Sequence, residues 1–235
     1  MKEVKKMSTL NSEYFEIENQ ELLNEYYELL INRITHSSMS IEKDLGNPDT
    51  SENAIRLRDN MRAFKKLINY MNFSLNEELI NEVADEINKS SMYISNGYRK
   101  VGDYIADTTI KITDPKNIRL ELLNLIEKYQ TDWQQMEPYE KEARFHIEFI
   151  RIHPFEDGNG RTARLLLNYN LLKQQIAPII ITDDLLEYYE EYIKNEDIEG
   201  MRNLFRIQSL KEQKVLNILY EEYQQNKDKN TKKRR

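Results

Sequence analysis

Residues that break helices are rare in this sequence, and their scarcity limits its fold more than any other feature. The chain has 235 residues but only six glycines and five prolines, and it is rich in leucine, isoleucine, glutamate, lysine and glutamine. These residues favour helices over sheets. Apolar residues also recur at helical spacing, as in Phe145, Phe149 and Ile152. We therefore expect an all-α protein that folds as one compact helical domain.

Local signals place the expected helices along the chain. Ser74 and Glu77 have the spacing of a capping box and predict a helix start there. Pro138 suits a first helical turn, and Pro154 should end the helix that follows. The other expected helices cover residues 21–34, 54–71, 117–135, 165–175, 183–195 and 197–207, with a last segment to about 225.

One stretch resembles β-structure. Residues 98–113 carry many β-branched and aromatic side chains between Gly97 and Pro115. We expect a short hairpin there, with its turn near Gly102 or near Ala106. We divide the chain into an N-terminal helical region (1–60), a core with C-terminal helices (61–225) and a basic, disordered tail (226–235).

Composition excludes several classes of function. The chain has no cysteine, which excludes disulfides and thiolate chemistry, and its three histidines lack the spacing of a zinc site. The net charge of −7 makes nucleic acid an unlikely partner. No apolar run reaches the length of a membrane span, so we expect no membrane association and a cytoplasmic location.

The most informative stretch is HPFEDGNGRTAR, residues 153–164. Gly158 and Gly160 allow the backbone to approach a ligand closely, and the next helix should begin near Gly160 or Arg161. The positive end of that helix would face the same point as Arg161 and Arg164, which are three residues apart. Backbone amides, a helix end and two guanidinium groups together predict a polyphosphate site.

Two side chains in this stretch could carry chemistry. Asp157 would repel phosphate unless a divalent cation lay between them, so we expect it to be a Mg²⁺ ligand. His153 belongs to the residue type that titrates near neutrality and is the candidate general base. Phe155 should anchor the loop in the core. His146, in the preceding apolar helix, should be a core histidine rather than a ligand. The sequence contains neither a Walker loop nor a kinase pattern.

This stretch matches the Fic-domain motif, His-x-Phe-x-Asp/Glu-Gly-Asn-Gly-Arg-x-x-Arg, at every fixed position. The resemblance implies a Fic-like helical fold that transfers AMP from ATP to a Ser, Thr or Tyr hydroxyl of a target protein and releases pyrophosphate. It implies that His153 takes the hydroxyl proton and that Asp157 holds Mg²⁺. Gly158, Asn159 and Gly160 would form the anion hole. Arg161 would hold the phosphates, and Arg164 would clamp the γ-phosphate.

The resemblance also implies features outside the motif. The segment from about 98 to 112 resembles the family's flap, which holds the target by strand addition. Tyr188 and Tyr189 match a tyrosine pair near the adenine, and Asn195 matches a polar residue shortly after. Either tyrosine could instead belong to a half-buried helix face.

Ser38 and Glu42 resemble the family's inhibitory helix, which we place at about residues 30–45. Their spacing of four matches Ser/Thr-x-x-x-Glu, whereas Lys43 departs from the Gly or Asn that normally follows. By resemblance, Glu42 would pair with Arg164 and remove the γ-phosphate clamp. The chain would then be an autoinhibited enzyme.

Alternatives remain open at the level of sequence. The same residues could form a hydrolase that removes AMP, with Glu42 positioning water, or a non-catalytic nucleotide-binding interaction module. Transfer of another nucleotide, or of a γ-phosphate, is a further alternative. Self-modification and a homo-oligomer are both compatible with the sequence.

Overall fold

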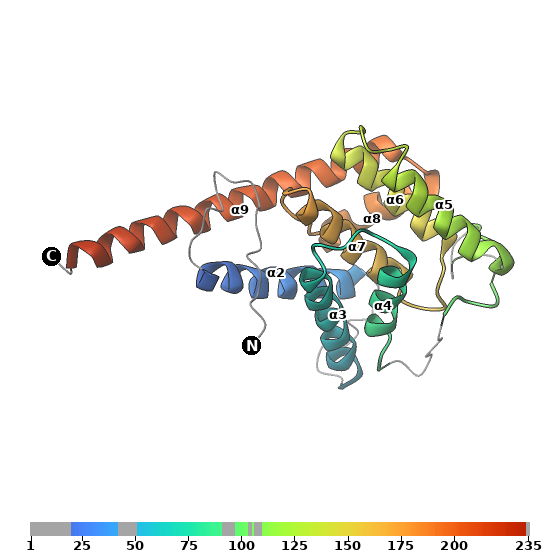
Figure 1. The fold of residues 1–235 in the computed structure, drawn as a ribbon, viewed down its shortest axis with the longest axis horizontal. Coiled ribbons are helices and arrows are strands. Elements are labelled where there is room, and N and C mark those ends of the chain that lie inside the picture. Colours follow the sequence, from blue (N-terminus) through green and yellow to red (C-terminus); the bar gives the residue numbers. More distant parts are fainter. Residues whose placement is uncertain (1–19, 42–50, 91–96, 103–104, 106–109, 234–235) are drawn as a thin grey trace.

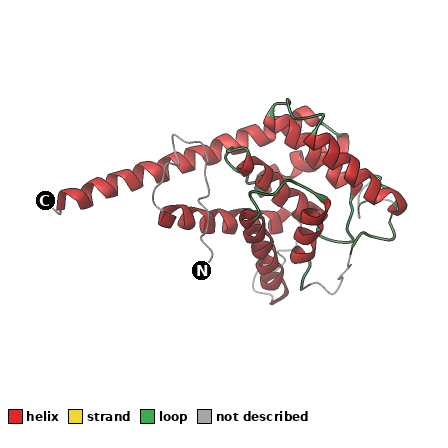
Figure 2. Ribbon diagram, in the orientation of Figure 1, coloured by secondary structure: helices red, strands yellow, loops and turns green. Residues whose placement is uncertain are grey.

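The computed structural model describes residues 20–41, 51–90, 97–102, 105 and 110–233. Within these ranges the regular structure is helical, which confirms the all-α prediction (Figures 1 and 2). The helices are α2 (Gln20–Ile41), α3 (Ser51–Asn69), α4 (Glu77–Ile87), α5 (Ile118–Gln130), α6 (Pro138–Ile152), α7 (Asn159–Lys173), α8 (Leu186–Asn195) and α9 (Ile198–Lys233). Short 3₁₀ turns at Pro115–Asn117 and Asp183–Leu185 precede α5 and α8.

Helices α6 and α7 form the centre of the fold (Figure 1). Helices α5 and α9 pack against α6, whereas α2, α3 and α4 pack against α7. Every residue of α7 from 161 to 172 is buried, as is typical of a helix enclosed on all sides. The loop that joins α6 to α7 is the stretch 153–158, so the fold holds the motif between its two innermost helices.

Helix α4 starts differently from the prediction. The side chain of Asn76 accepts a hydrogen bond from the backbone N–H of Leu79 at 2.8 Å, so Asn76 is the N-cap. The predicted capping box from Ser74 to Glu77 is therefore wrong. Asn76 is itself a strong N-cap residue and lies the right distance before Leu79 to satisfy its N–H.

Other boundaries also differ. Helix α5 ends at Gln130, five residues earlier than predicted. Helix α9 continues to Lys233, through most of the segment that we expected to be a disordered tail, and projects beyond the helical body (Figure 1). The division expected at residue 60 falls inside α3. No helix among the described residues is both long enough and apolar enough to cross a bilayer.

The predicted hairpin lies largely outside the described residues. Residues 103–104 and 106–109 are not described. The backbone N–H of Ile105 donates to the carbonyl of Ile110 at 3.1 Å, and Lys111 forms an isolated bridge. These contacts bring the two sides of the segment together, and the hairpin itself stays a prediction.

A buried carboxyl group joins the central helices. Glu142 of α6 is fully buried and accepts hydrogen bonds from the Tyr129 hydroxyl at 2.5 Å and the Asn170 amide at 3.0 Å. The Gln174 amide donates to it at 3.0 Å. Burial raises the pKa of Glu142 to about 7, although these donors oppose the shift. The folded protein therefore binds a proton that the unfolded chain releases between about pH 4.5 and 7.

We expect Glu142→Gln to change how stability depends on pH. Because the pKa of Glu142 is raised in the fold, its protonation stabilises the folded state fully below pH 4.5. This contribution is lost as the pH rises through about 7. Glutamine does not titrate. The free energy of unfolding of the variant, relative to that of wild type, should therefore rise by about 3 kcal/mol as the pH increases from 4.5 to 7. Urea unfolding at several pH values measures this, with the partly exposed Glu148 of the same helix, changed to Gln, as control. A difference that does not vary with pH would contradict the prediction.

Candidate active site

His153 ends α6 in an unusual conformation. Its backbone is left-handed (φ 50°), and its N–H still donates to the carbonyl of Phe149 at 3.0 Å. Left-handed backbone is uncommon for residues other than glycine and is often found at functional sites. The ring nitrogen Nδ1 lies 3.3 Å from the carbonyl of Ile150. If Nδ1 carries the proton in that contact, Nε2 is the nitrogen that can accept one.

Asn159 shapes the loop that follows. Its side chain accepts from the N–H of Phe155 at 2.9 Å and donates to the carbonyl of Phe155 at 2.7 Å. The amide is therefore used inside the loop, and any anion contact by Asn159 would come from its backbone N–H. Phe155 is 3% exposed, which confirms that it anchors the loop in the core.

Gly158 is the N-cap of α7 and has a positive φ of 80°. A Cβ added there would lie 3.0 Å from the side-chain amide of Asn88 and 3.1 Å from Ile87. The same Asn88 amide donates to the carbonyl of Asp157 at 2.9 Å. The end of α4 is thus pressed against the loop, and both space and backbone conformation require glycine at position 158.

Gly158→Ala should therefore weaken nucleotide binding. The new methyl group would push the loop away from Asn88 and strain the backbone, at a cost of about 1–3 kcal/mol, which corresponds to a loss of roughly 5- to 150-fold in affinity. Calorimetry with ATP and Mg²⁺ measures this. Gly97→Ala is the matched control, because a Cβ there meets nothing within 4 Å although its φ is also positive. Equal losses in both variants would show that the fit against Asn88 has no specific effect.

The start of α7 has the properties of an anion site. Its first N–H groups have no partner inside the helix and lie at the positive end of its dipole. Arg161 is 1% exposed and pairs with Asp157 at 3.0 Å. Its Nε has no hydrogen-bond acceptor among the described residues. Because an unsatisfied buried donor costs about 1–3 kcal/mol, this arrangement suits a bound anion.

Asp157 is the acidic group of the loop. One carboxylate oxygen accepts from the N–H of Gly158 at 2.6 Å, and the other pairs with Arg161. Its side chain is 34% exposed, so a ligand can reach it. Among the described residues, no cluster of three acidic or histidine side chains could hold a metal alone. Asp157 thus offers one accessible carboxylate, and Mg²⁺ bound together with phosphates uses one or two carboxylates, phosphate oxygens and water.

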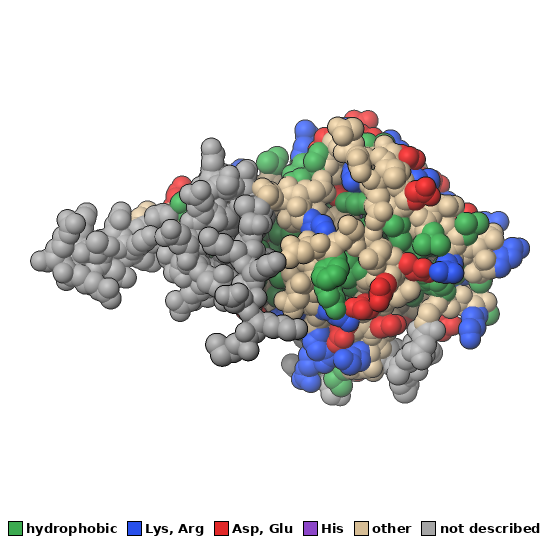
Figure 3. Space-filling model, viewed as in Figure 1, with side chains coloured by type: hydrophobic (Ala, Val, Ile, Leu, Met, Phe, Trp, Pro, Cys, Tyr) green, Lys and Arg blue, Asp and Glu red, His purple; other side chains and the backbone are tan. Residues whose placement is uncertain are grey.

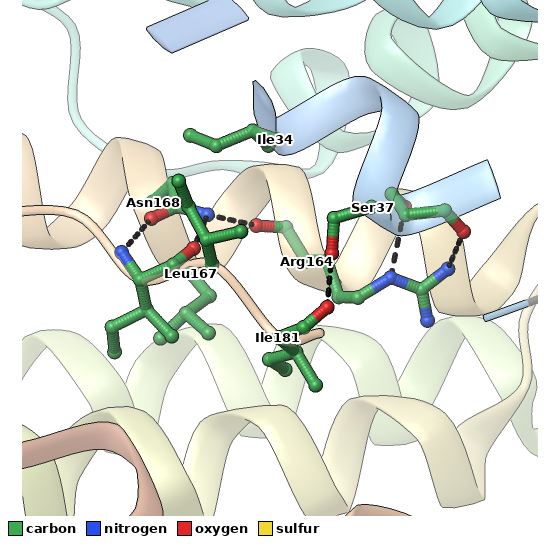
Figure 4. A pocket seen from close by; sticks show the side chains of 9 residues that line it. Ile34, Ser37, Arg164, Leu167, Asn168 and Ile181 are labelled. Carbon is green, nitrogen blue, oxygen red and sulfur yellow. Dashed lines mark hydrogen bonds between the residues drawn. The ribbon is translucent and has the colours of Figure 1, made fainter. Parts of the chain in front are cut away.

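Helix α2 contacts the second arginine of the motif. Arg164 is 4% exposed, and its Nε and Nη2 donate to the hydroxyl and carbonyl of Ser38 at 2.8 and 3.0 Å (Figure 4). The adjacent Ser37 donates its hydroxyl to the carbonyl of Ile181. A cavity of about 10 Å³, at the lower limit for one water molecule, lies between α2, α7 and residues 179–181. The structure thus brings Ser38 and Arg164 together, while Glu42 lies outside the described residues.

The residues predicted near the adenine do not form one surface. Tyr189 is 2% exposed, and its hydroxyl lies 2.7 Å from Nε2 of His146. Burial, together with the charge of Arg164, lowers the pKa of His146 to about 3, so this histidine is a neutral core residue, as predicted. Tyr188 is 55% exposed, and Asn195 is exposed at the end of α8. The two tyrosines do not share a surface.

Two contacts of the loop were missed by the sequence analysis. Asn88 supports Asp157 and Gly158 from α4, and the buried Arg99 donates to the carbonyl of His153 at 2.6 Å. Asn88 follows a helix and Arg99 lies in the β-like stretch. Neither position has a local pattern that could indicate a long-range contact.

Charges of both signs are mixed on the surface of the described residues. On the face that Figure 3 shows, lysines and arginines are interspersed with acidic and apolar side chains. Exposed ion pairs such as Arg119 with Glu77, and Lys128 with Glu148, mix the two signs further.

Comparisons with known proteins agree with the motif. The model of the Fic/DOC family matches residues 71–171. A protein adenylyltransferase Fic from Nematostella vectensis is 47% identical over 76 residues, which are 32% of this chain and 18% of that protein. The chain thus spans less than a fifth of the length of this relative.

Solved structures share the fold. A Fic-domain signaling protein from Bacteroides thetaiotaomicron has a TM-score of 0.77 at 19% identity, over 90% of this chain and 95% of that one. IbpAFic2 covalently tethered to Cdc42 has a TM-score of 0.58 at 19% identity, over 81% of this chain and 61% of that one. The motif, the Fic/DOC family match at residues 71–171 and the fold of the described residues therefore agree, and each is similar to what Fic domains have.

Proposed function

We propose that this protein is a Mg²⁺-dependent adenylyltransferase that transfers AMP from ATP to a Ser, Thr or Tyr hydroxyl of a target protein. The observation that carries this proposal is the buried Arg161. Its guanidinium lies at the start of α7, pairs with Asp157 and has one donor unsatisfied among the described residues. A polyphosphate there would satisfy that donor and would lie on the loop that begins with His153.

The proposed reaction is an in-line displacement at the α-phosphorus. The target oxygen forms a bond to the α-phosphorus as the bond from that phosphorus to the α–β bridging oxygen breaks. Pyrophosphate leaves with that oxygen, and His153 accepts the hydroxyl proton. Because catalysis of this kind depends mainly on positioning and charge stabilisation, a preformed loop between two buried helices suits it.

Each motif residue has a proposed task in this reaction. The backbone N–H groups of Gly158, Asn159 and Gly160 would receive phosphate oxygens, and Arg161 would neutralise their charge. Asp157 would hold Mg²⁺, which would supply positive charge to the phosphates. Tyr188, Tyr189 and Asn195 are proposed near the adenine. For Tyr189 this requires the side chain to leave its contact with His146 or to act through it.

We also propose that α2 restrains the enzyme. Arg164, the proposed γ-phosphate clamp, already donates to Ser38. Glu42 follows Ser38 by four positions in the sequence, and two residues at this spacing share one side of a helix wherever both are helical. An acid beside Arg164 would compete with the γ-phosphate for the guanidinium and would repel that phosphate.

The proposed partner is a folded protein that presents a hydroxyl side chain. IbpAFic2, which shares the fold, has been crystallised with adenylylated Cdc42 in a variant form. The segment from 98 to 112 would hold the target next to His153 by strand addition. Modification of the chain itself is a second outcome of the same chemistry.

Incubation with Mg²⁺ and ATP labelled at the α- or the γ-phosphorus tests the proposal. Covalent α-label on protein, with pyrophosphate in solution, is expected. Covalent γ-label would indicate a kinase. ATP binding without any label would indicate a binding module, and release of AMP from protein already modified would indicate a hydrolase.

A further inference from the structure

Arg99 occupies the space between the end of α6 and the two sides of the β-like segment. It is 4% exposed, and five hydrogen bonds of its side chain go to backbone carbonyl oxygens. A buried guanidinium that faces carbonyls can fix several backbone segments at once, because its donors point in fixed directions from one plane.

One part of the guanidinium holds the end of α6. Nε donates to the carbonyl of His153 at 2.6 Å, and Nη2 contacts the carbonyl of Ile152 at 3.4 Å. The last carbonyls of a helix lack partners within it and form the negative end of its dipole. Arg99 therefore supplies both hydrogen bonds and positive charge at the residue whose backbone is left-handed.

The other part holds the β-like segment. Nη1 donates to the carbonyl of Gly102 at 2.8 Å and contacts that of Val101 at 3.2 Å, while Nη2 donates to the carbonyl of Thr113. One side chain thus bonds to both sides of the segment, residues 99–102 and 110–113.

Two backbone bonds reinforce this connection. The N–H of Arg99 donates to the carbonyl of Pro154 at 2.9 Å, and the N–H of Thr113 donates to the carbonyl of Arg151 at 3.2 Å. The two sides of the segment therefore bond on either side of His153. Thr113 bonds to Arg151, which precedes His153, and Arg99 bonds to Pro154, which follows it. The guanidinium fills the space that these bonds enclose.

We propose that Arg99 is a positioning residue for His153. Its guanidinium keeps the carbonyl of His153 in the orientation that the left-handed backbone requires, and ties that carbonyl to both sides of residues 99–113. This rests on the proposed function, in which the imidazole serves as base. The base and the segment that would hold the target then keep one relative position, which is what proton transfer to the imidazole needs.

The consequence is specific to the reaction step. The five side-chain hydrogen bonds of Arg99 go to residues 101, 102, 113, 152 and 153, and none of these residues belongs to the start of α7. Its loss should displace the imidazole and the segment while leaving the start of α7 intact. Because small misplacements of a catalytic group cost large factors in rate, turnover should fall without a matching loss of ATP affinity.

The test compares Arg99→Lys and Arg99→Ala with wild type in the full chain. We expect kcat for α-label transfer to fall at least about tenfold in Arg99→Lys and further in Arg99→Ala. The Kd for ATP should stay within about twofold of wild type. Millimolar guanidinium should restore part of the Arg99→Ala activity, whereas methylammonium should not. Arg151→Gln is the matched control, because Arg151 lies at the same helix end but pairs with Glu196 on the surface.

Several outcomes would overturn the inference. The inference fails if the Arg99→Lys variant folds and transfers AMP at the wild-type rate. It also fails if kcat and ATP affinity decrease in equal proportion. If the Arg99→Ala variant does not fold, the rate and the ATP affinity of the Arg99→Lys variant test the inference. If wild type itself shows no transfer that depends on His153, the proposed function fails. In that case NMR tests the role of Arg99 separately. The ring signals of His153 should shift in Arg99→Lys, while those of the exposed His36 should not. Unshifted His153 signals would overturn the inference.

Discussion

Replacing His153 by alanine should reduce AMP transfer about 1,000-fold, within the range for removal of a general base, and should leave ATP binding nearly unchanged. The imidazole lies at the end of α6, whereas the groups proposed to hold phosphates lie at the start of α7. The variant removes the proton acceptor and leaves the anion site, so binding and turnover should separate.

Single-turnover assays with α-labelled ATP, together with calorimetry, measure this separation. His36→Ala is the control, because His36 is exposed on α2 and should have no part in the reaction. If His153→Ala retains more than about a tenth of the wild-type rate, the histidine is not the base. If it loses ATP binding as well, the imidazole has a role in holding the nucleotide.

Replacing Glu42 by glycine should raise AMP transfer by up to about 100-fold, which is within the usual range of coupling between two sites. In the structure the guanidinium of Arg164 already donates to Ser38 of α2. Removal of the proposed acidic partner would let Arg164 turn to the γ-phosphate, and ATP would then bind with its α-phosphorus correctly placed.

Initial rates at saturating ATP measure this release, with Lys43→Ala as control for a charge change at the neighbouring position. Ser38→Ala should give a smaller increase, because the Ser38 carbonyl would still accept from Arg164. Equal rates for wild type and Glu42→Gly would mean that α2 does not restrain the enzyme. A gain in Lys43→Ala of the same size would mean that the end of the helix, rather than its glutamate, is responsible.

Local features of the fold followed from the sequence. The helix start at Pro138, the helix end before Pro154 and the burial of Phe155 depend on neighbouring residues, and all three were predicted correctly. The helix that starts after Gly158 was expected one or two residues too late. The motif from 153 to 164 forms one loop and one helix start, so its residues come together through local structure alone.

Contacts between distant segments could not be predicted in this way. Arg99 reaches His153 across 54 positions and Asn88 reaches Asp157 across 69, and neither has a periodic pattern around it. The tyrosine pair shows the same limit. Two adjacent helical residues point about 100° apart, so packing against His146 buries Tyr189 and leaves Tyr188 exposed.

A crystal structure of the Glu42→Gly variant with Mg²⁺ and a non-hydrolysable ATP analogue tests the central claim most directly. The β- and γ-phosphates should contact the N–H groups at the start of α7 and the guanidinium of Arg161, with the α-phosphorus next to the imidazole of His153. Phosphates bound away from α7, or an α-phosphorus out of reach of His153, would contradict the proposed reaction.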